Sequence, residues 1–189
     1  MKKYELLKDD TIEVAGKTLF RIKALISFKD IRKGEIGGYV EAERNLSQSD
    51  NAWVTGNAWV CDDACVTGNA RVSDNAWVTG NACVCDDACV CDDACVTGNA
   101  RVSGNACVTG NARVSDNAWV ETSNDYIVFK NNWSSFRWFT YTKSNKMWRV
   151  GCFYGTGDEL IKEAYADSEE SGRKYELYVN LVKELYRDE

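Results

Sequence analysis

Cysteine is the residue type with the greatest chemical potential in this chain, which contains nine cysteines and no histidine. Eight of the nine lie between positions 61 and 107, and Cys83 with Cys85 and Cys89 with Cys91 are separated by a single valine. Thiolates are nucleophiles and ligands for Zn²⁺ and softer cations. Without histidine, however, the chain forms no Cys-His or Ser-His nucleophile pair and no histidine-ligated zinc site.

A repeat of six residues positions most of these cysteines. From Asn51 to Thr122 the chain consists of twelve consecutive hexads without an insertion, of the type Asn-Ala-Trp-Val-Thr-Gly. Alanine and valine stand two positions apart and therefore share one face of a short strand, while the residue between them points to the opposite face. Successive hexads are joined by Gly-Asn, Asp-Asn or Asp-Asp, which accept left-handed backbone conformations. The pattern predicts short strands and corners that coil around an alanine and valine core.

The repeat resembles that of the hexapeptide-repeat left-handed β-helix proteins. Their repeat has an aliphatic residue at one position and a small residue four positions later, as in Val54 and Ala58 or Val60 and Ala64. In that family three hexads make one triangular coil. The resemblance therefore implies a mainly β fold, a left-handed parallel β-helix of about four to five triangular coils stacked about 4.8 Å apart.

Segments on both sides of the repeat are similar to a group of bacterial and phage-borne β-helix proteins. The similarity lies in residues 36–50 and around the sequence MWRVGCFYGTGDEL near the C-terminal end. Gly38-Tyr39-Val40 and Arg44-Asn45-Leu46 resemble irregular first hexads, and a two-residue insertion separates them from the regular ones. This resemblance implies a phage or prophage origin and assigns no biochemical role.

In a coil of three hexads, residues 18 apart stand above one another, and the outward positions form three columns that we call ladders. The ladders are Trp53, Arg71, Cys89, Cys107; Trp59, Trp77, Cys95, Arg113; and Cys65, Cys83, Arg101, Trp119. Trp59 and Trp77 are expected to stack face to face, while Trp53 with Arg71 and Arg101 with Trp119 are expected to make cation–π contacts. Because tryptophan and arginine are enriched at binding hot spots, the tryptophans and arginines of the ladders are the candidate binding surface. The interpretation that we favour over a binding surface is that the ladders stabilise the repeat.

The same stacking gathers thiols into two L-shaped groups. These groups are Cys65, Cys83 and Cys85, and Cys89, Cys91 and Cys107. Three thiolates can hold a soft metal ion, but the separations within each group come from β geometry and no Cys-x-x-Cys spacing is present. We favour the interpretation that cysteine replaces other small residues in a duplicated repeat and that the thiols are free, as is usual in the cytosol. Disulfides between stacked thiols are a third alternative, near the limit of the favourable Cβ separation. No metal or other cofactor is therefore assigned.

Acidic side chains are concentrated in the repeat. Positions 51–122 carry 3 basic and 9 acidic residues, a charge of −6 that equals the net charge of the whole chain. This balance disfavours direct nucleic-acid binding. Asp74 and Asp92 share one edge of the coil, which allows a calcium site, but Gly-Asn fills the same slots elsewhere and favours simple turn chemistry. Mimicry of DNA is a further alternative, although the charge is smaller than that of a duplex of similar height.

The two flanks are predicted to cap the open ends of the β-helix, because open ends expose unpaired strand edges. We divide the chain into an N-terminal β cap with an irregular first coil (1–50), the β-helix (51–122) and a small C-terminal α+β domain (123–189). In the N-terminal cap the strand-like segments are Tyr4–Leu7, Ile12–Val14 and Thr18–Leu25.

The C-terminal domain is predicted to contain three strands and two helices. The expected strands are Tyr126–Phe129, Phe136–Thr142 and Met147–Phe153. A capping box at Thr156 and Glu159 predicts the start of the first helix. The second helix is expected from about Gly172 to Arg187, with Leu185 on its apolar face, and Cys152 is expected to be buried.

The acyltransferases of the hexapeptide-repeat family, and a carbonic anhydrase branch, depend on histidine and usually on a loop that projects from a coil. This chain has no histidine, and its hexads are uninterrupted, so we predict that it is not an enzyme. We expect a phage- or prophage-type accessory protein that presents a rigid β-helix surface for protein–protein interaction or self-assembly. The alternatives are a phage counter-defence inhibitor that binds a host immune protein, for example of CRISPR type, and a degenerate acyltransferase relative.

The expected partner is therefore another protein or a second copy of the chain in a homo-oligomer. No apolar run approaches the length that spans a bilayer, and no secretory signal is recognisable, so membrane association is not expected. The expected location is the cytoplasm, which for a phage-encoded protein is the cytoplasm of the bacterial host.

Overall fold

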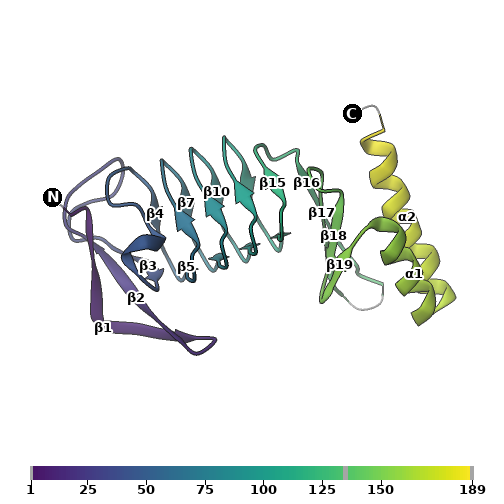
Figure 1. Cartoon of the computed structure of the whole chain (residues 1–189), viewed down its shortest axis with the longest axis horizontal. Helices are drawn as coiled ribbons and strands as arrows, with labels where there is room; N and C mark the ends of the chain where they lie inside the picture. The colour runs from purple at the N-terminus through teal and green to yellow at the C-terminus, as the bar shows by residue number, and fades with distance from the viewer. Residues whose placement is uncertain (1, 134–135, 188–189) are drawn as a thin grey trace.

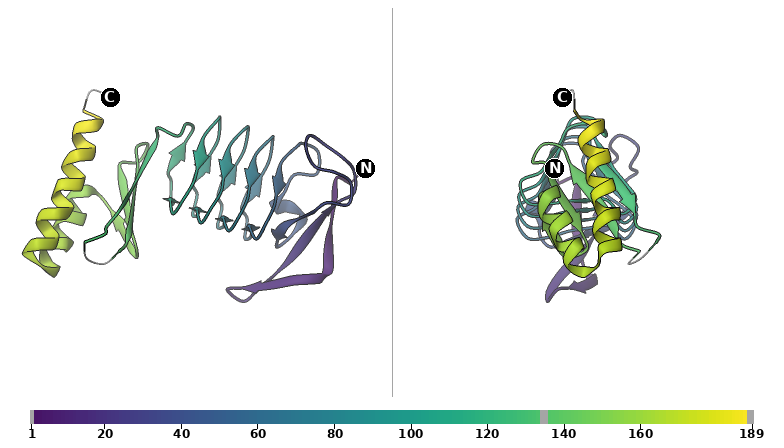
Figure 2. Two further views of the ribbon diagram at one scale, coloured as in Figure 1. Left: turned by 180° about the vertical axis from the view of Figure 1, so that it is seen from behind. Right: turned by 90° about the vertical axis from the view of Figure 1, so that its right-hand side faces the viewer.

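The computed structural model describes residues 2–133 and 136–187. It shows an elongated molecule in which a stack of coils separates the N-terminal strands from two C-terminal helices (Figure 1). The view from the C-terminal end shows the coils superimposed on one another, with the helices in front of them (Figure 2). The chain therefore advances from one end of the molecule to the other, coil by coil.

Strands of two residues form the walls of the solenoid, and each begins at the outward residue of one hexad. They are β4 (Trp53–Val54), β5 (Trp59–Val60), β6 (Cys65–Val66), β7 (Arg71–Val72), β8 (Trp77–Val78), β9 (Cys83–Val84), β10 (Cys89–Val90), β11 (Cys95–Val96), β12 (Arg101–Val102), β13 (Cys107–Val108), β14 (Arg113–Val114) and β15 (Trp119–Val120). Strands three apart in this series pair in parallel, which gives three walls: β4-β7-β10-β13, β5-β8-β11-β14 and β6-β9-β12-β15. The mainly β, parallel solenoid of about five coils confirms the fold class expected from the repeat.

The register places residues 18 apart directly against each other, as in Val54 with Val72 and Val72 with Val90. All alanines and valines of the inward positions from Ala52 to Val120 are at most 1% exposed. β-Branched valine suits an extended backbone, and alanine leaves room where the three walls meet. Two residue types, alternating at fixed positions, therefore fill the whole solenoid core.

The corners of the coil use the left-handed backbone that their residues predict. One residue in each corner has a positive φ, for example +66° at Gly56 and +61° at Asp62. Aspartate is accepted there because its carboxylate bonds the next coil: Asp62 accepts the N–H of Gly80 at 3.0 Å. Neighbouring asparagine side chains also donate hydrogen bonds from coil to coil. Turn chemistry thus accounts for the acidic corners.

The N-terminal strands extend one wall of the solenoid. β1 (Tyr4–Val14) and β2 (Lys17–Ala24) form an antiparallel hairpin, β2 pairs with β3 (Ile36–Val40), and β3 pairs in parallel with β5. β1 is one long strand with a register shift between Leu7 and Thr11, not the two separate segments that the sequence suggested. The antiparallel hairpin therefore covers an edge that would otherwise be exposed.

An irregular first coil joins this hairpin to the regular repeat. Tyr39 of β3 pairs with Trp59, and Leu46, which follows the short helical turn η1 (Glu43–Asn45), bridges to Val66. Both pairs are 20 residues apart rather than 18, which confirms the two-residue insertion expected before the first regular hexad.

The C-terminal region is an antiparallel sheet covered by two helices. Its elements are β16 (Tyr126–Lys130), β17 (Trp138–Thr142), β18 (Met147–Val150), β19 (Phe153–Gly155), α1 (Gly157–Asp167) and α2 (Glu169–Leu185). The sheet has four strands, so the prediction of three was wrong: Gly151 has a φ of +58° and turns the chain between β18 and β19. β17 also begins later than predicted, because Phe136 has a φ of +54° and lies outside the strand.

Caps determine where the two helices begin. The side chain of Thr156 accepts the N–H of Glu159, and the Glu159 carboxylate accepts the N–H of Thr156 at 2.8 Å, which confirms the predicted capping box. α2 begins before the predicted position because Ser168 accepts the N–H of Ser171 at 3.1 Å. Among the described residues, no helix is long and apolar enough to cross a bilayer.

Aromatic side chains dominate the core between this sheet and α2. Phe139 is fully buried, and its ring centroid lies 4.8 Å from that of Tyr175 and 5.1 Å from that of Tyr178. Trp148 is 2% exposed and packs against Tyr141. This second core is separate from the alanine and valine core of the solenoid, and its contacts come from segments far apart in the chain.

Candidate functional site

The three predicted ladders form in the structure. Trp53 pairs with Arg71, Arg71 with Cys89 and Cys89 with Cys107 along one wall. The other two walls show the same 18-residue pairing over all their outward residues. The seven predicted binding residues nevertheless differ in exposure, because the N-terminal strands cover some of them and leave others open to solvent.

Trp53 is not part of an exposed surface, contrary to the prediction. Its side chain has no exposed area, and its ring packs edge-on against Tyr4 and Phe28 from the N-terminal region, with centroids 6.2 and 5.5 Å away. Arg71 is engaged as well, in an ion pair with Asp30. The first coil is therefore capped by aromatic packing, which sequence reasoning from the repeat alone did not reveal.

Trp59 and Trp77 contact each other, although not face to face. Their ring centroids are 5.1 Å apart and their planes are inclined by 39°. Trp59 is half-buried because it also packs on the cluster formed by Leu19, Tyr39 and Cys61. This pair therefore stabilises the junction between the N-terminal hairpin and the solenoid, in agreement with the structural interpretation of the ladders.

The exposed part of the predicted surface lies at the C-terminal end of the solenoid. Arg101 and Arg113 are exposed, and Trp119 keeps 52% of its area accessible. Arg101 and Trp119 line an open hollow of about 460 Å³ together with Asp86. The register pairs Arg101 with Trp119, but among the described residues no cation–π contact joins their side chains, so the predicted cation–π contact is wrong and both side chains face solvent.

The two thiol groups differ in how tightly they are assembled. The Sγ atoms of Cys89, Cys91 and Cys107 all lie within 4.8 Å of one another, and the three residues are half-buried. Burial, followed by the charge of neighbouring Cys89, raises the pKa of Cys91 to about 12. The group of Cys65, Cys83 and Cys85 is not among the described sets of three ligand atoms that approach this closely. All cysteines of the chain are free, and Cys152 is exposed rather than buried because it lies in the turn between β18 and β19.

Two mixed groups of carboxylates and thiols also occur along the solenoid edges. Asp74, Cys91 and Asp92 form one, and Glu41, Cys61 and Asp62 form the other. Lys17 pairs with Glu41 and Asp62, and the hydrogen bond from Lys17 is the main cause that holds the pKa of Asp62 below its usual range. The ammonium group of Lys17 therefore balances the charge of this second group. The ion pairs of Lys17 connect the N-terminal hairpin to the first regular coil.

A surface that the sequence reasoning missed lies on α2. Leu177, Leu181 and Leu185 are 65%, 47% and 57% exposed, and their spacing of four residues places them in one stripe along the helix. Leu185 was expected on the buried face, but Tyr175, Val179 and Val182 occupy that face instead. The signal available in the sequence was the run of leucines at four-residue intervals, in which Leu177 and Leu181 lie two positions after the buried Tyr175 and Val179.

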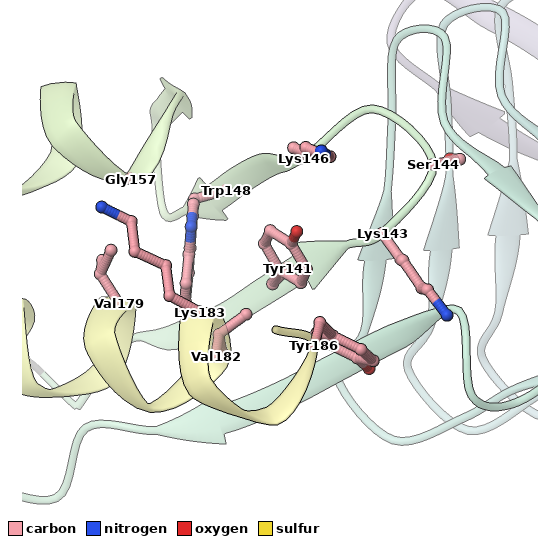
Figure 3. Close-up of a pocket in the computed structure, with 10 residues that line it drawn as sticks. All are labelled: Tyr141, Lys143, Ser144, Lys146, Trp148, Gly157, Val179, Val182, Lys183 and Tyr186. Carbon is pink, nitrogen blue, oxygen red and sulfur yellow. The ribbon is translucent and has the colours of Figure 1, made fainter. Parts of the chain in front are cut away.

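A cleft of about 500 Å³ lies between α2 and the C-terminal sheet (Figure 3). Tyr141, Trp148 and Tyr186 form its apolar wall, and Lys143 and Lys183 stand at its margins. The two ammonium groups point in opposite directions in Figure 3, and Lys183 pairs with Asp158 at 2.9 Å. The cleft therefore presents an aromatic surface without a converging set of charged groups.

Comparison with known proteins agrees with the solenoid. A family described as the YdcK beta solenoid repeat matches residues 100–116. No curated protein matches the chain. The matched segment covers less than one coil, so it supports the fold and assigns no activity. The uninterrupted repeat, the pairing of residues 18 apart and this match together identify the chain as a β-solenoid repeat protein.

Proposed function

We propose that this protein is a non-enzymatic structural and binding protein that self-associates through α2, with the solenoid as a rigid spacer behind the interface. The observation that carries this proposal is the exposed stripe of Leu177, Leu181 and Leu185. A surface helix normally directs its leucines toward a core, and contiguous apolar area left in solvent marks an interaction site. α2 itself lies at the C-terminal end of the elongated molecule (Figure 1).

Charges beside the stripe favour an antiparallel pair of helices. In the register that places Leu177 opposite Leu181 of a second copy, Lys174 lies opposite Glu184 of that copy, because both pairs of numbers have the same sum. Within one chain Lys174 pairs with Glu170 and Glu184 pairs with Arg187, so the contact between copies would extend these surface ion pairs. Arg173, which is exposed on the same stripe, is brought beside Glu184 as well. A parallel pair would place Lys174 against Lys174. The arrangement is self-complementary, as a two-fold symmetric dimer requires.

The absence of enzymatic activity is part of the proposal, and the sequence supports it. The chain contains no histidine, and the hexads from 51 to 122 have no inserted loop that would build an active site beside a coil. In the described part of the chain, four corner carboxylates accept hydrogen bonds from the next coil, those of Asp62, Asp74, Asp86 and Asp92. A rigid, uniformly bonded solenoid is suited to holding two ends at a fixed separation.

The molar mass in solution tests the proposal directly. Light scattering after gel filtration, under reducing conditions, should give twice the 21.2 kDa of one chain. The double variant Leu177→Glu with Leu181→Glu should be monomeric, because it places four like charges in the interface. Trp119→Ser is the matched control: it removes an equally exposed apolar side chain from the solenoid and should leave the dimer intact. A monomeric wild-type protein, or a dimer that survives the double substitution, contradicts the proposal.

A second candidate function is binding of a different protein by the C-terminal end of the solenoid wall. Trp119 and Arg101, exposed in the same open hollow, favour it, since these residue types dominate binding hot spots. For a phage-type accessory protein, as the sequence resemblance implies, the partner would be a host protein. In a pull-down, Trp119→Ser should then lose that partner, while the double leucine variant keeps it. The opposite pattern would exclude this surface.

A further inference from the structure

We propose that Cys89, Cys91 and Cys107 form a binding site for one thiophilic d¹⁰ cation of the Zn²⁺ and Cd²⁺ class. The site is independent of self-association, because it lies on the solenoid wall, whereas the proposed dimer uses α2. The three residues are placed by the repeat itself: Cys89 and Cys107 pair across adjacent coils, and Cys91 follows Cys89 by two residues on the same outward face.

The distances between the sulfur atoms suit one metal ion. All three Sγ atoms lie within 4.8 Å of one another. Zn–S bonds of about 2.3 Å in a tetrahedral site require sulfur atoms about 3.8 Å apart. The three sulfur atoms therefore lie close to the separation that a shared cation requires. Their half-buried position leaves the fourth ligand place accessible to water.

Charged groups around the thiols favour a cation at this position. A carboxylate oxygen of Asp74 and one of Asp92 lie within 4.8 Å of the Cys91 sulfur. One oxygen of Asp92 accepts the N–H of Gly110 at 2.9 Å, which fixes the orientation of the carboxylate. On the opposite side Arg71 lies below Cys89, but it forms an ion pair with Asp30. Bound to three thiolates, a divalent cation leaves a charge of only −1 on the cluster.

Binding must release protons, and this gives the site a distinctive pH dependence. A free cysteine thiol has a pKa of about 8.5, and it ligates a cation only as the thiolate. Each sulfur that ligates the cation gives up its proton to solvent, and up to three protons leave for each cation bound. The affinity should therefore increase as the pH rises from 6 to 8.

The chain contains its own control for this proposal. Cys65, Cys83 and Cys85 form a similar L-shaped group, with Cys65 paired to Cys83 and Cys85 two residues beyond Cys83, but Cys65 lies on the preceding coil, whereas Cys107 lies on the coil that follows Cys89. Arg101 pairs with Cys83 on the other adjacent coil, and this second group lacks the close approach of three sulfur atoms. Cys65 is therefore a control of the same residue type at the same outward position of the hexad.

Titration of Cd²⁺ into the reduced full-length protein tests the proposal, with thiolate-to-metal charge-transfer absorbance in the ultraviolet as the readout. We expect saturation at one equivalent, release of two to three protons, and displacement of Cd²⁺ by excess Zn²⁺. Cys107→Ser should weaken binding more than tenfold, and Cys65→Ser should change it less than twofold. Circular dichroism establishes that both variants keep the solenoid fold. Cys91→Ser and Cys85→Ser form a second matched pair with the same expectation.

Three results would overturn the proposal. The first is the absence of a saturable signal at one equivalent in the wild-type protein. The second is equal loss of binding in Cys107→Ser and Cys65→Ser, which would indicate nonspecific binding to scattered thiols. The third is binding that is retained when Cys89, Cys91 and Cys107 are all replaced by serine.

Discussion

The solenoid core contains alanine and valine repeated at fixed positions, whereas the core of the C-terminal region contains large aromatic residues drawn from strands and helices. In the solenoid, burial depends on the place of a residue within its hexad, so that Val54 and Val120 are both fully buried although they lie at opposite ends of the regular repeat. In the C-terminal region, Phe139 is buried only because α2 returns over the sheet with Tyr175 and Tyr178. A periodic core is thus determined locally, and an aromatic core is determined by tertiary fit.

The largest expected effect comes from a charge placed in the periodic core. Val78→Asp buries an unpaired carboxylate in a solenoid wall and should reduce the free energy of unfolding by about 5 kcal/mol or more. Thr79→Asp, one residue further and on the outward face, should cost less than about 1 kcal/mol. Chemical denaturation followed by circular dichroism compares the two. Equal losses would show that the place in the hexad does not control stability.

Truncation of a side chain in the aromatic core should reduce the free energy of unfolding nearly as much as Val78→Asp does. The destabilisation should be confined to the C-terminal region. Phe139→Ala removes a fully buried ring and should destabilise the C-terminal region by about 3–5 kcal/mol. Amide hydrogen exchange should show loss of protection in β16–β19 and in both helices, while the solenoid strands stay protected. If protection falls equally along the solenoid, the two cores form one cooperative unit and the comparison fails.

Substitution of a corner residue separates two contributions to the stability of the solenoid, the hydrogen bond to the next coil and the left-handed backbone. Asp86 has a φ of +61°, and its carboxylate accepts the N–H of Gly104 at 3.2 Å. Asp86→Ala keeps a side chain in the left-handed conformation but loses the hydrogen bond, so it should cost about 1–2 kcal/mol. Asp86→Gly should cost less, since glycine occupies equivalent corners. The difference in denaturation midpoint measures this, and a more stable alanine variant would contradict it.

The helix cap of the C-terminal region gives a smaller effect. Thr156→Ala removes the acceptor for the N–H of Glu159 and should lower the stability of that region by about 1 kcal/mol. Thr156→Ser keeps the hydroxyl and is the matched control. Exchange of the first-turn amides of α1 provides the readout, with no change expected in the solenoid.

Acid should weaken the junction between the N-terminal hairpin and the solenoid. The N–H of Asp62 and then Lys17 hold the pKa of Glu41 below its usual value, and Lys17 does the same for Asp62. Because both folded-state pKa values lie below those of the unfolded chain, this stabilisation is present above about pH 4 and is lost as the pH falls further. Lys17→Met should reduce the pH dependence of the melting temperature. If the pH dependence of the melting temperature is unchanged in Lys17→Met, other titratable groups cause it.

Much of the solenoid could be predicted because its information is local and repeated. The inward valines, the corner residues and the 18-residue columns follow from six positions and one geometry, and the capping box of Thr156 is equally local. Trp53 could not be placed from the hexad, because Tyr4 and Phe28 reach it from a segment outside the repeat. The turn at Gly151 was also missed, since glycine alone does not show whether a strand bends or ends.

For the candidate sites, too, some features follow from the sequence and others only from the tertiary structure. The sequence by itself determined that Cys89, Cys91 and Cys107 stand together, because a parallel register stacks equivalent positions in every coil. It did not determine how closely their sulfur atoms approach, or that Leu177 and Leu181 face solvent. α2 has two apolar faces, one rich in leucine and one rich in tyrosine and valine. Which of them is exposed depends on which one packs against the C-terminal sheet. Only the tertiary structure selects between them, because burial of one face is a property of the neighbouring surface and not of the helix.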